Sequence, residues 1–333
     1  MRIRTLIGMF CLGLALCIDP AVAQTPLRIA STAQPGSLLM NFVDEMVDKV
    51  NKGSNGTIKS ERLFIGSEQE MVTQIARGRI EMGNVSYTGS AVLIPEAAVL
   101  TMPYLWKSDG ERDFVTDNHA LPMLKKIFEA KGLVIVGLGE VGWTDVLCKK
   151  ACVSPADVKG MKARMAPAMT SKAFWNAVGA NGIQMPVSEL FPALQTGLVE
   201  GADLPFSYYV SSPAAQLAPH YVLTRHLHQG YTLIINKSIW DKLTPEQQKV
   251  VSESRPDVTR FRQAVSDAEK PKMAEFKAKG GFVHDLTPAQ RAEWAKLVEP
   301  HQQKVIDEIG GQSAELWAAI QKGKQEYAAK GGK

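Results

Sequence analysis

The sequence predicts an α/β fold, in which strands alternate with amphipathic helices and pair into a largely parallel sheet. Residues 26–30 read as an apolar strand, and the segment after Ser37 carries its apolar side chains on one helical face. The run from Leu133 to Leu138 is almost entirely apolar, which is typical of a strand covered on both faces. Strands that alternate with helices in this way favour parallel pairing.

The elements expected next continue the alternation. Residues 57–64 are extended, residues 68–76 form a second amphipathic helix, and residues 80–85 form a short strand. Three later helices begin with one signature, a hydroxyl N-cap, a proline in the first turn and a side chain three residues on that can return to the cap. These caps are Ser154, Thr244 and Thr287.

The composition is that of an ordinary globular protein. Of the 333 residues, 45% are hydrophobic and 22% are charged, which excludes collagen-like, disordered and disulfide-dense classes. The 38 basic and 34 acidic residues give a net charge of +4, and neither sign is concentrated in a block. Because a nucleic-acid binder usually carries a basic patch, we expect no nucleic-acid partner.

Residues 1–23 have the features of a secretory signal peptide. Arg2 and Arg4 precede a largely apolar run, and Ala21-Val22-Ala23 supplies the small residues of a cleavage site after Ala23. The apolar run, from Thr5 to Cys17, is shorter than the roughly 20 residues that span a membrane. We therefore expect an exported protein that works in the periplasm.

Export changes the interpretation of the cysteines. Cys11 and Cys17 leave with the signal peptide, so only Cys148 and Cys152 remain. In an oxidising compartment an isolated pair favours a disulfide, although two free thiols on a strand end are the alternative. Two cysteines alone fall short of a four-ligand zinc site.

The common catalytic signatures are missing. The sequence contains no GxSxG, HExxH, P-loop or GxGxxG motif, so we expect no enzymatic activity and no cofactor. His226 and His228 could place two imidazoles on one face of a strand, but no third ligand is near, and two surface histidines are expected rather than a metal site. A secreted hydrolase with scattered catalytic residues is the alternative class.

The most specific signal lies in residues 154–212. It opens with SPADVKGMKARMAP and continues, from Met185 to Gly201, with MPVSELFPALQTGLVEG. This stretch resembles the solute-binding subunits of tripartite ATP-independent periplasmic (TRAP) transporters, of the C4-dicarboxylate-binding type, whose pattern includes DLKGLKIR and PxxxxEVYxALQTGVVDG. The resemblance covers essentially all of the chain after the signal peptide.

The resemblance implies a periplasmic binding protein fold with two α/β lobes, a hinge and a long helix that spans both lobes. Lobe 1 would comprise residues 24–141 and 230–269, and lobe 2 residues 142–229 and 270–333 with the C-terminal helices. The protein would bind a small organic acid between the lobes and deliver it, as a monomer, to the small and large membrane subunits of a TRAP transporter. A binding protein of another transporter or of a sensor is a further alternative.

Arg164 aligns with the arginine that binds the ligand carboxylate in this family. It is expected in a short strand, where a permanent cation needs a partner, and its planar guanidinium matches a carboxylate with two parallel donors. The structural alternative is an ordinary surface ion pair.

Further candidates for ligand contact are weaker. Glu68 matches a family position that contacts ligand or water, but it could simply favour its helix N-terminus. Trp143 could stack on the ligand or pack in the core, and Tyr87 and Thr88 follow a strand end, where α/β clefts bind ligands. The others follow the Gly201 turn or could supply a polar group: Phe206, Tyr208 and Gln229.

One departure from the family bears on the ligand. Where the family reads DGQENP, this chain places Leu204 at the asparagine that contacts the ligand carboxylate, and Val187 replaces the phenylalanine before EVY. We therefore expect an acid with one carboxylate and an apolar or aromatic remainder. The alternative is that Leu204 turns away and that Gln229 or Asn84 replaces the amide, which would restore a dicarboxylate ligand.

Overall fold

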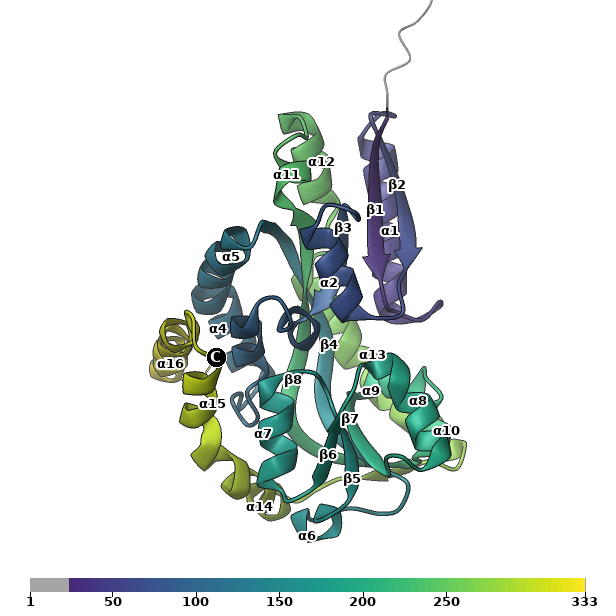
Figure 1. Cartoon of the computed structure of the whole chain (residues 1–333), viewed down its shortest axis with the longest axis vertical. Coiled ribbons are helices and arrows are strands. Elements are labelled where there is room, and N and C mark those ends of the chain that lie inside the picture. The colour runs from purple at the N-terminus through teal and green to yellow at the C-terminus, as the bar shows by residue number, and fades with distance from the viewer. Residues whose placement is uncertain (1–23, 333) are drawn as a thin grey trace, which may run out of the picture.

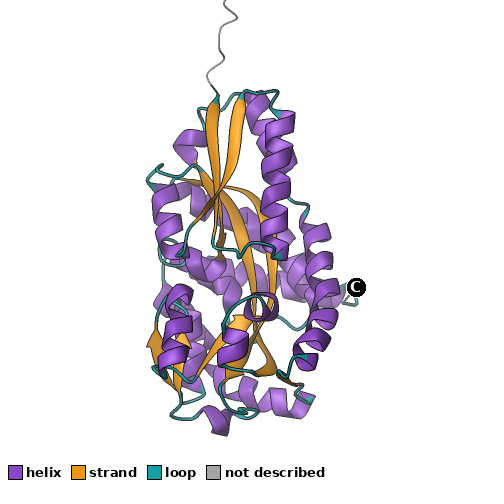
Figure 2. Cartoon of the chain, turned by 90° about the vertical axis from the view of Figure 1, so that its right-hand side faces the viewer, coloured by secondary structure: helices purple, strands orange, loops and turns teal. Residues whose placement is uncertain are grey.

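The computed structural model describes residues 24–332, so the signal peptide expected at residues 1–23 lies outside the described residues. The molecule is elongated along two long central strands, and helices flank both sides of the sheet (Figures 1 and 2). Within the described range, no helix has the length and apolar character needed to cross a membrane.

The described residues form one mixed sheet with the order β2-β1-β3-β8-β4-β7-β5-β6, and β9 pairs with β8. The outer pairs are parallel, as the sequence predicts, but β3, β4 and β7 pair antiparallel with their long central neighbours. The prediction of a largely parallel sheet is therefore only partly correct, because the strands at the centre of the sheet pair antiparallel. The strands are β1 (Thr25–Ser31), β2 (Ile58–Phe64), β3 (Met82–Ser86), β4 (Leu133–Cys148), β5 (Lys162–Met165), β6 (Asn181–Gln184), β7 (Gly201–Pro205), β8 (His220–Asn236) and β9 (Phe282–His284).

The strands β4 and β8 run side by side through both halves of the molecule (Figure 1). The sequence indicated a strand only over residues 133–138, because glycines then break the apolar run. The ladder continues past them through register shifts, among them one between Glu140 and Gly142. At Gly139 a Cβ would lie 1.9 Å from the ring of Tyr231, so only glycine fits.

Helices cover both faces of the sheet. In the first half these are α1 (Leu38–Gly53), α2 (Glu68–Ala76), α3 (Tyr87–Ser90), η1 (Pro95–Thr101), α4 (Asp109–Val115), η2 (Thr116–Ala120) and α5 (Leu121–Ala130). The next are α6 (Pro155–Val158), α7 (Met169–Ala177), α8 (Val187–Thr196), α9 (Phe206–Val210), α10 (Ala214–Leu217), α11 (Lys237–Trp240) and α12 (Pro245–Ser254). The last are α13 (Val258–Ala278), α14 (Pro288–Val298), η3 (Glu299–His301), α15 (Gln302–Ile309) and α16 (Ser313–Ala329).

The helix starts that the sequence predicts are confirmed. Ser37 caps α1 by accepting from the backbone N–H of Met40. Capping boxes begin the helices after Ser154, Thr244 and Thr287, although the first of these helices has only four residues.

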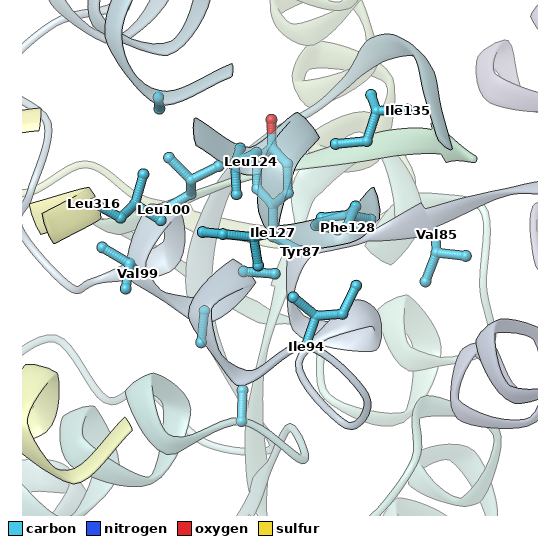
Figure 3. Packing of buried hydrophobic residues seen from close by; sticks show 14 of the residues in the cluster. Val85, Tyr87, Ile94, Val99, Leu100, Leu124, Ile127, Phe128, Ile135 and Leu316 are labelled. Atoms are coloured by element: carbon cyan, nitrogen blue, oxygen red, sulfur yellow. The ribbon is translucent and has the colours of Figure 1, made fainter. Parts of the chain in front are cut away.

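Two apolar clusters fill the half of the molecule that contains β1, β2 and β3. Figure 3 shows one of them, where Tyr87, Leu124 and Phe128 pack together. Ile306 of α15 and Leu316 of α16 belong to this cluster, although the sequence grouped the C-terminal helices with the second lobe. These helices therefore bury their apolar side chains against the first half of the chain.

Two further clusters fill the other half, around β5, β6 and β7. Trp175 and Trp294 lie in one, and Tyr209 and Tyr221 lie in the other. The helix α13 reaches both halves. Its Phe261 stacks on Phe42 of α1 at a centroid distance of 3.9 Å, and its Phe276 packs edge-on against Tyr209 at 5.3 Å. This is the long helix that the resemblance implies.

Cys148, at the end of β4, and Cys152 are joined by a disulfide in the structure, with their Cα atoms 6.4 Å apart. Both side chains are buried in the same apolar cluster as Trp175. Burial keeps the bond away from solvent reductants, so it is positioned as a structural link rather than a reactive one.

We predict that the exported protein carries this bond. Mass spectrometry of denatured, unreduced protein treated with iodoacetamide should show no added carbamidomethyl groups, and prior reduction should add two. Alkylation of both thiols without reductant would contradict the prediction.

Candidate functional site

A cavity of about 110 Å³ lies between the two halves of the molecule. Its walls come largely from residues that follow the carboxyl ends of parallel strands, the place where open α/β sheets bind ligands, and from the middle of β4 and β8. The residues that line the cavity are Thr32, Ala33, Leu39, Glu68, Gln69, Ser86, Thr88, Val141, Thr144, Arg164, Ala166, Pro167, Ser171, Val187, Asp203, Leu204, Pro205, Tyr208, Leu227 and Gln229.

Arg164, on β5, is the cation of this cavity. Its side chain is only 5% exposed, and its Nε donates to the backbone oxygen of Met185 at 3.0 Å. Among residues 24–332, no carboxylate forms an ion pair with it, and its two terminal amino groups have no hydrogen-bond partner. Burial lowers the pKa of Arg164, while the charges of Asp203, Tyr208 and Glu68 act in the opposite direction. The guanidinium therefore offers two donors toward the cavity.

Two carboxylates flank the cavity, and each is engaged elsewhere. Asp203 accepts from the indole Nε1 of Trp175 at 3.0 Å and lies 3.5 Å from the Nε2 of His226. Glu68 accepts from the backbone N–H of Ser86 at 3.0 Å and from its hydroxyl at 2.6 Å. Burial raises the pKa of Glu68, although these hydrogen bonds and Arg164 oppose the shift. Both acids are thus held by protein donors in place.

A hydrogen-bonded chain continues from Glu68 along the wall. The hydroxyls of Ser86 and Thr88 lie 3.1 Å apart, and the amide Nε2 of Gln229 donates to Thr88 at 2.7 Å. Thr88 and Gln229 are both buried. The chain joins the half that carries β3 to the crossing strand β8.

Several other lining residues are aliphatic. Leu204 borders the cavity, is 4% exposed and packs in the cluster of Tyr209 and Tyr221, whose hydroxyl donates to the Leu204 backbone oxygen at 2.8 Å. Tyr208 adds one aromatic ring, and burial raises the pKa of its hydroxyl. The other apolar lining residues are Leu39, Val141, Val187 and Leu227.

Six of the nine residues that the sequence nominates for ligand contact lie on this cavity: Arg164, Glu68, Leu204, Thr88, Tyr208 and Gln229. Trp143, Tyr87 and Phe206 do not line it. The indole of Trp143 donates to Asp109 at 2.9 Å and packs edge-on against His228. Tyr87 is buried in the apolar cluster that Figure 3 shows. The ring of Phe206 packs against that of Tyr221, with the ring centroids 5.1 Å apart.

Sequence reasoning missed several polar residues of the wall. Asp203 directly precedes Leu204 on β7, and its position beside the departure from the family pattern was the available signal. Thr144 lies on β4, beyond the point where the expected strand ended. Ser171 accepts from the backbone N–H of Ala166 at 2.9 Å and so holds the wall in shape.

His226 and His228 are not surface histidines. His226 is fully buried, stacks on Phe174 at a centroid distance of 3.8 Å and hydrogen-bonds to Thr224 at 2.8 Å. His228 is 4% exposed. No cluster of three potential metal ligands occurs within residues 24–332. Both imidazoles are therefore buried side chains of β8, one on each side of Leu227 in the sequence.

Behind the cavity, His228 belongs to a buried charge network. Its Nε2 lies 2.7 Å from Oε1 of Glu140, and Arg112 lies 3.3 Å from the other oxygen. Burial lowers the pKa of His228 against the pull of Glu140. Burial alone would raise the pKa of Glu140, but His228 and Arg112 hold it below its usual range.

Comparison of the sequence with protein families identifies the family of the chain. The model of the family described as "Bacterial extracellular solute-binding protein, family 7" matches residues 29–308. Two relatives extend over nearly all of the chain. The C4-dicarboxylate-binding periplasmic protein DctP of Rhodobacter capsulatus is 26% identical, over 95% of this chain and 96% of its own length. The 2,3-diketo-L-gulonate-binding periplasmic protein YiaO of Escherichia coli K12 is 25% identical, over 96% and 99%.

Solved structures show the same fold. A TRAP periplasmic solute-binding protein from Desulfovibrio salexigens with bound orotic acid has a TM-score of 0.86 at 20% identity, covering 91% of this chain and 99% of that one. The sugar acid binding protein DctPAm from Advenella mimigardefordensis, in complex with galactonate, has a TM-score of 0.84 at 23% identity, covering 90% and 99%. The two-lobed α/β architecture expected from the sequence is thereby confirmed.

The buried histidine makes stability depend on pH. Since the folded-state pKa of His228 lies below its ordinary value of 6.5, the unfolded chain takes up a proton first as the pH falls. The free energy of unfolding should therefore fall below about pH 6.5, by at most about 1.4 kcal/mol per pH unit from this group. Urea titrations at pH 7.5 and 5.5 should show a smaller loss for His228→Gln than for the wild type.

The matched control is the exposed His301→Gln, which should lose as much stability as the wild type. An unchanged pH dependence in His228→Gln would rule out this role for the imidazole.

Proposed function

The chain belongs to the bacterial extracellular solute-binding proteins of family 7, and we propose that it binds a small organic acid in the cavity around Arg164. In this proposal the protein is exported, works in the periplasm as a monomer and passes its solute to the small and large membrane subunits of a TRAP transporter. The names of its relatives support this role, since both of those described above are periplasmic proteins that bind organic acids.

The observation that carries the proposal is the state of Arg164. A buried guanidinium whose terminal donors face a cavity is costly unless an anion completes it. A carboxylate matches both donors at once, with charge-assisted hydrogen bonds. The flanking acids do not serve, because Asp203 and Glu68 are engaged by Trp175 and Ser86.

The wall of the cavity narrows the class of acid. Besides the polar chain from Glu68 to Gln229, the lining contains aliphatic side chains, among them Leu204. With Trp143, Tyr87 and Phe206 placed elsewhere, Tyr208 is the aromatic contribution within the described residues. We therefore propose a monocarboxylate whose remainder is aliphatic in part, rather than a dicarboxylate.

The two halves of the molecule are proposed to act as lobes, with boundaries where β4 and β8 cross between them. In this division residues 24–141 and 230–269 form lobe 1, and residues 142–229 and 270–333 form lobe 2. The register shifts in the β4–β8 ladder support a hinge there, because interrupted pairing bends more easily than a regular ladder. The packing of α15 and α16 against lobe 1 would make these helices a strap across the hinge.

Fewer observations support the alternative functions, a secreted hydrolase or a binding protein of another transporter or sensor. A secreted hydrolase would need a nucleophile with an activating base, and the cavity's serines are held by structural hydrogen bonds from Ala166 and to Glu68. We propose that the protein does no chemistry on its solute. Delivery to another transporter or to a sensor would use the same cavity, and the genes that neighbour this one would separate these partners.

Arg164→Ala should abolish useful binding of carboxylates. Loss of one member of a buried charge pair costs about 2–5 kcal/mol, which is roughly 30-fold to several-thousand-fold in affinity. A thermal-shift screen of organic acids identifies a probe, and calorimetry then compares the variant with Arg62→Ala. Arg62 pairs with Asp44 on the surface, so its loss should leave affinity unchanged. Near-normal affinity in a folded Arg164→Ala protein would contradict the assignment.

Binding should also close the lobes. A solute between them gains contacts with both only in the closed form, so it shifts the population in that direction. Small-angle scattering should give a smaller radius of gyration with a saturating acid from the screen, and no change with Arg164→Ala. An unchanged radius in the saturated wild-type protein would count against hinge closure.

A further inference from the structure

Two buried polar atoms of the cavity wall have no partner among residues 24–332. They are Oε1 of Gln229, on β8, and Oγ1 of Thr144, on β4. Gln229 is 8% exposed and Thr144 is 3% exposed. Because Gly142 pairs with Gln229 and Thr144 pairs with Leu227, the two side chains are diagonal neighbours on one face of the ladder. Diagonal neighbours lie roughly 7–8 Å apart, a separation that a group placed between the long Gln229 and the short Thr144 side chains can bridge.

The hydrogen-bonded chain fixes which end of the Gln229 amide is left without a partner. Ser86 donates its hydroxyl proton to the Glu68 carboxylate, so its oxygen accepts from the Thr88 hydroxyl. The Thr88 proton is thereby used, and its oxygen accepts from Nε2 of Gln229. An amide turned the other way would place its carbonyl oxygen against an oxygen that has no proton left to give. The free atom of Gln229 is therefore an acceptor.

An acceptor beside a hydroxyl selects the ligand group that lies there. A ligand hydroxyl can donate to Oε1 of Gln229 and accept from the hydroxyl of Thr144, which satisfies both atoms. A keto or carboxylate oxygen has no proton for Gln229 and would leave its oxygen buried and unpaired, at a large cost in affinity. An ammonium group brings three donors to these two atoms, while the nearby Asp203 and Glu68 are already engaged.

We infer that the solute is a hydroxy monocarboxylic acid, whose carboxylate binds Arg164 and whose hydroxyl binds Gln229 and Thr144. This inference rests on the proposed function and names the class of acid within it. Gln229 is thus a specificity-determining residue, and Glu68 positions it from the other end of the chain through Ser86 and Thr88.

Calorimetry on the mature wild-type protein tests the inference with matched probes. These are butanoate and hexanoate, the 2-, 3- and 4-hydroxy derivatives of each, and succinate and 2-aminobutanoate as competing chemistries. At least one hydroxylated acid should bind tenfold or more tightly than its parent acid and than succinate. Hydroxylated and parent acids that bind within threefold of each other would overturn the inference, as would tightest binding of succinate or of 2-aminobutanoate.

A variant locates the preference. Gln229→Met keeps the length of the side chain and removes the acceptor, so the advantage of the hydroxylated acid over its parent acid should fall to within about threefold. The control is Gln302→Met, because Gln302 also donates its amide, to the Pro103 backbone oxygen at 2.7 Å, away from the cavity. An advantage that persists in Gln229→Met would overturn the assignment to this residue.

The two proposals fail differently. Absence of binding by every carboxylate, in a protein whose thermal unfolding is cooperative, would defeat the proposed function and this inference with it. Binding of the parent acids that depends on Arg164 but ignores the hydroxyl would defeat this inference alone. The wild-type series decides the question even where a variant does not fold.

Discussion

The pairing of β4 with β8 is the constraint on which the rest of the structure depends. Both strands run through the whole length of the molecule, and the smaller strands of each half attach to them. The carboxyl ends of the parallel strands in the two halves consequently face each other across the ladder. The cavity forms where these ends meet, so Arg164 of one half and Glu68 of the other border the same space. Ligand binding is thus built into the topology of the sheet.

A continuous ladder of this length would be stiff, and the chain interrupts it at defined places. Between Thr144 and Val146 the register shifts, and Arg225 adopts a left-handed backbone with a φ of 49°. The fully buried carboxylate of Asp145 accepts the Arg225 backbone N–H there, and the Arg225 guanidinium pairs with Glu269 on α13. Arg225 is therefore held in its left-handed conformation by Asp145 at its backbone and by Glu269 at its side chain. A strained backbone of this kind persists only where the surrounding contacts fix it.

The helix α13 follows the same ladder and carries charges at both ends of the crossing. Arg262 pairs with Asp117 at 2.7 Å and with Asp113 at 3.0 Å, next to the network of Arg112 and Glu140. The side of the crossing strands behind the cavity is thus rich in ion pairs, whereas the cavity side holds unpaired polar atoms. Buried ion pairs are costly to rearrange, so this side of the ladder is expected to resist motion.

The sequence predicted most of the local structure, because caps, alternation and apolar faces are written in short windows. The bounds of α2 and the caps of α1, α12 and α14 follow from such windows. The antiparallel centre of the sheet could not be predicted this way, since it depends on residues about a hundred positions apart. Arg164 was found through the resemblance rather than through local pattern. That Trp143 and Phe206 do not line this cavity could not be predicted, because their neighbours in space, Asp109 and Tyr221, are distant in sequence.

The proposed class of solute depends mainly on the charged side chains that border the cavity. One cation, Arg164, faces the space, while Asp203 and Glu68 lie close enough to influence its pKa. At an effective dielectric of about 20, two unit charges 6 Å apart interact by roughly 3 kcal/mol. In the proposed function a single ligand carboxylate gains from the Arg164 guanidinium, whereas a second one toward Glu68 would lie beside a buried carboxyl group that already accepts from Ser86. The proposal therefore gives the solute a neutral remainder, whose hydrogen-bond donor would lie at the end of the polar chain, beside Gln229.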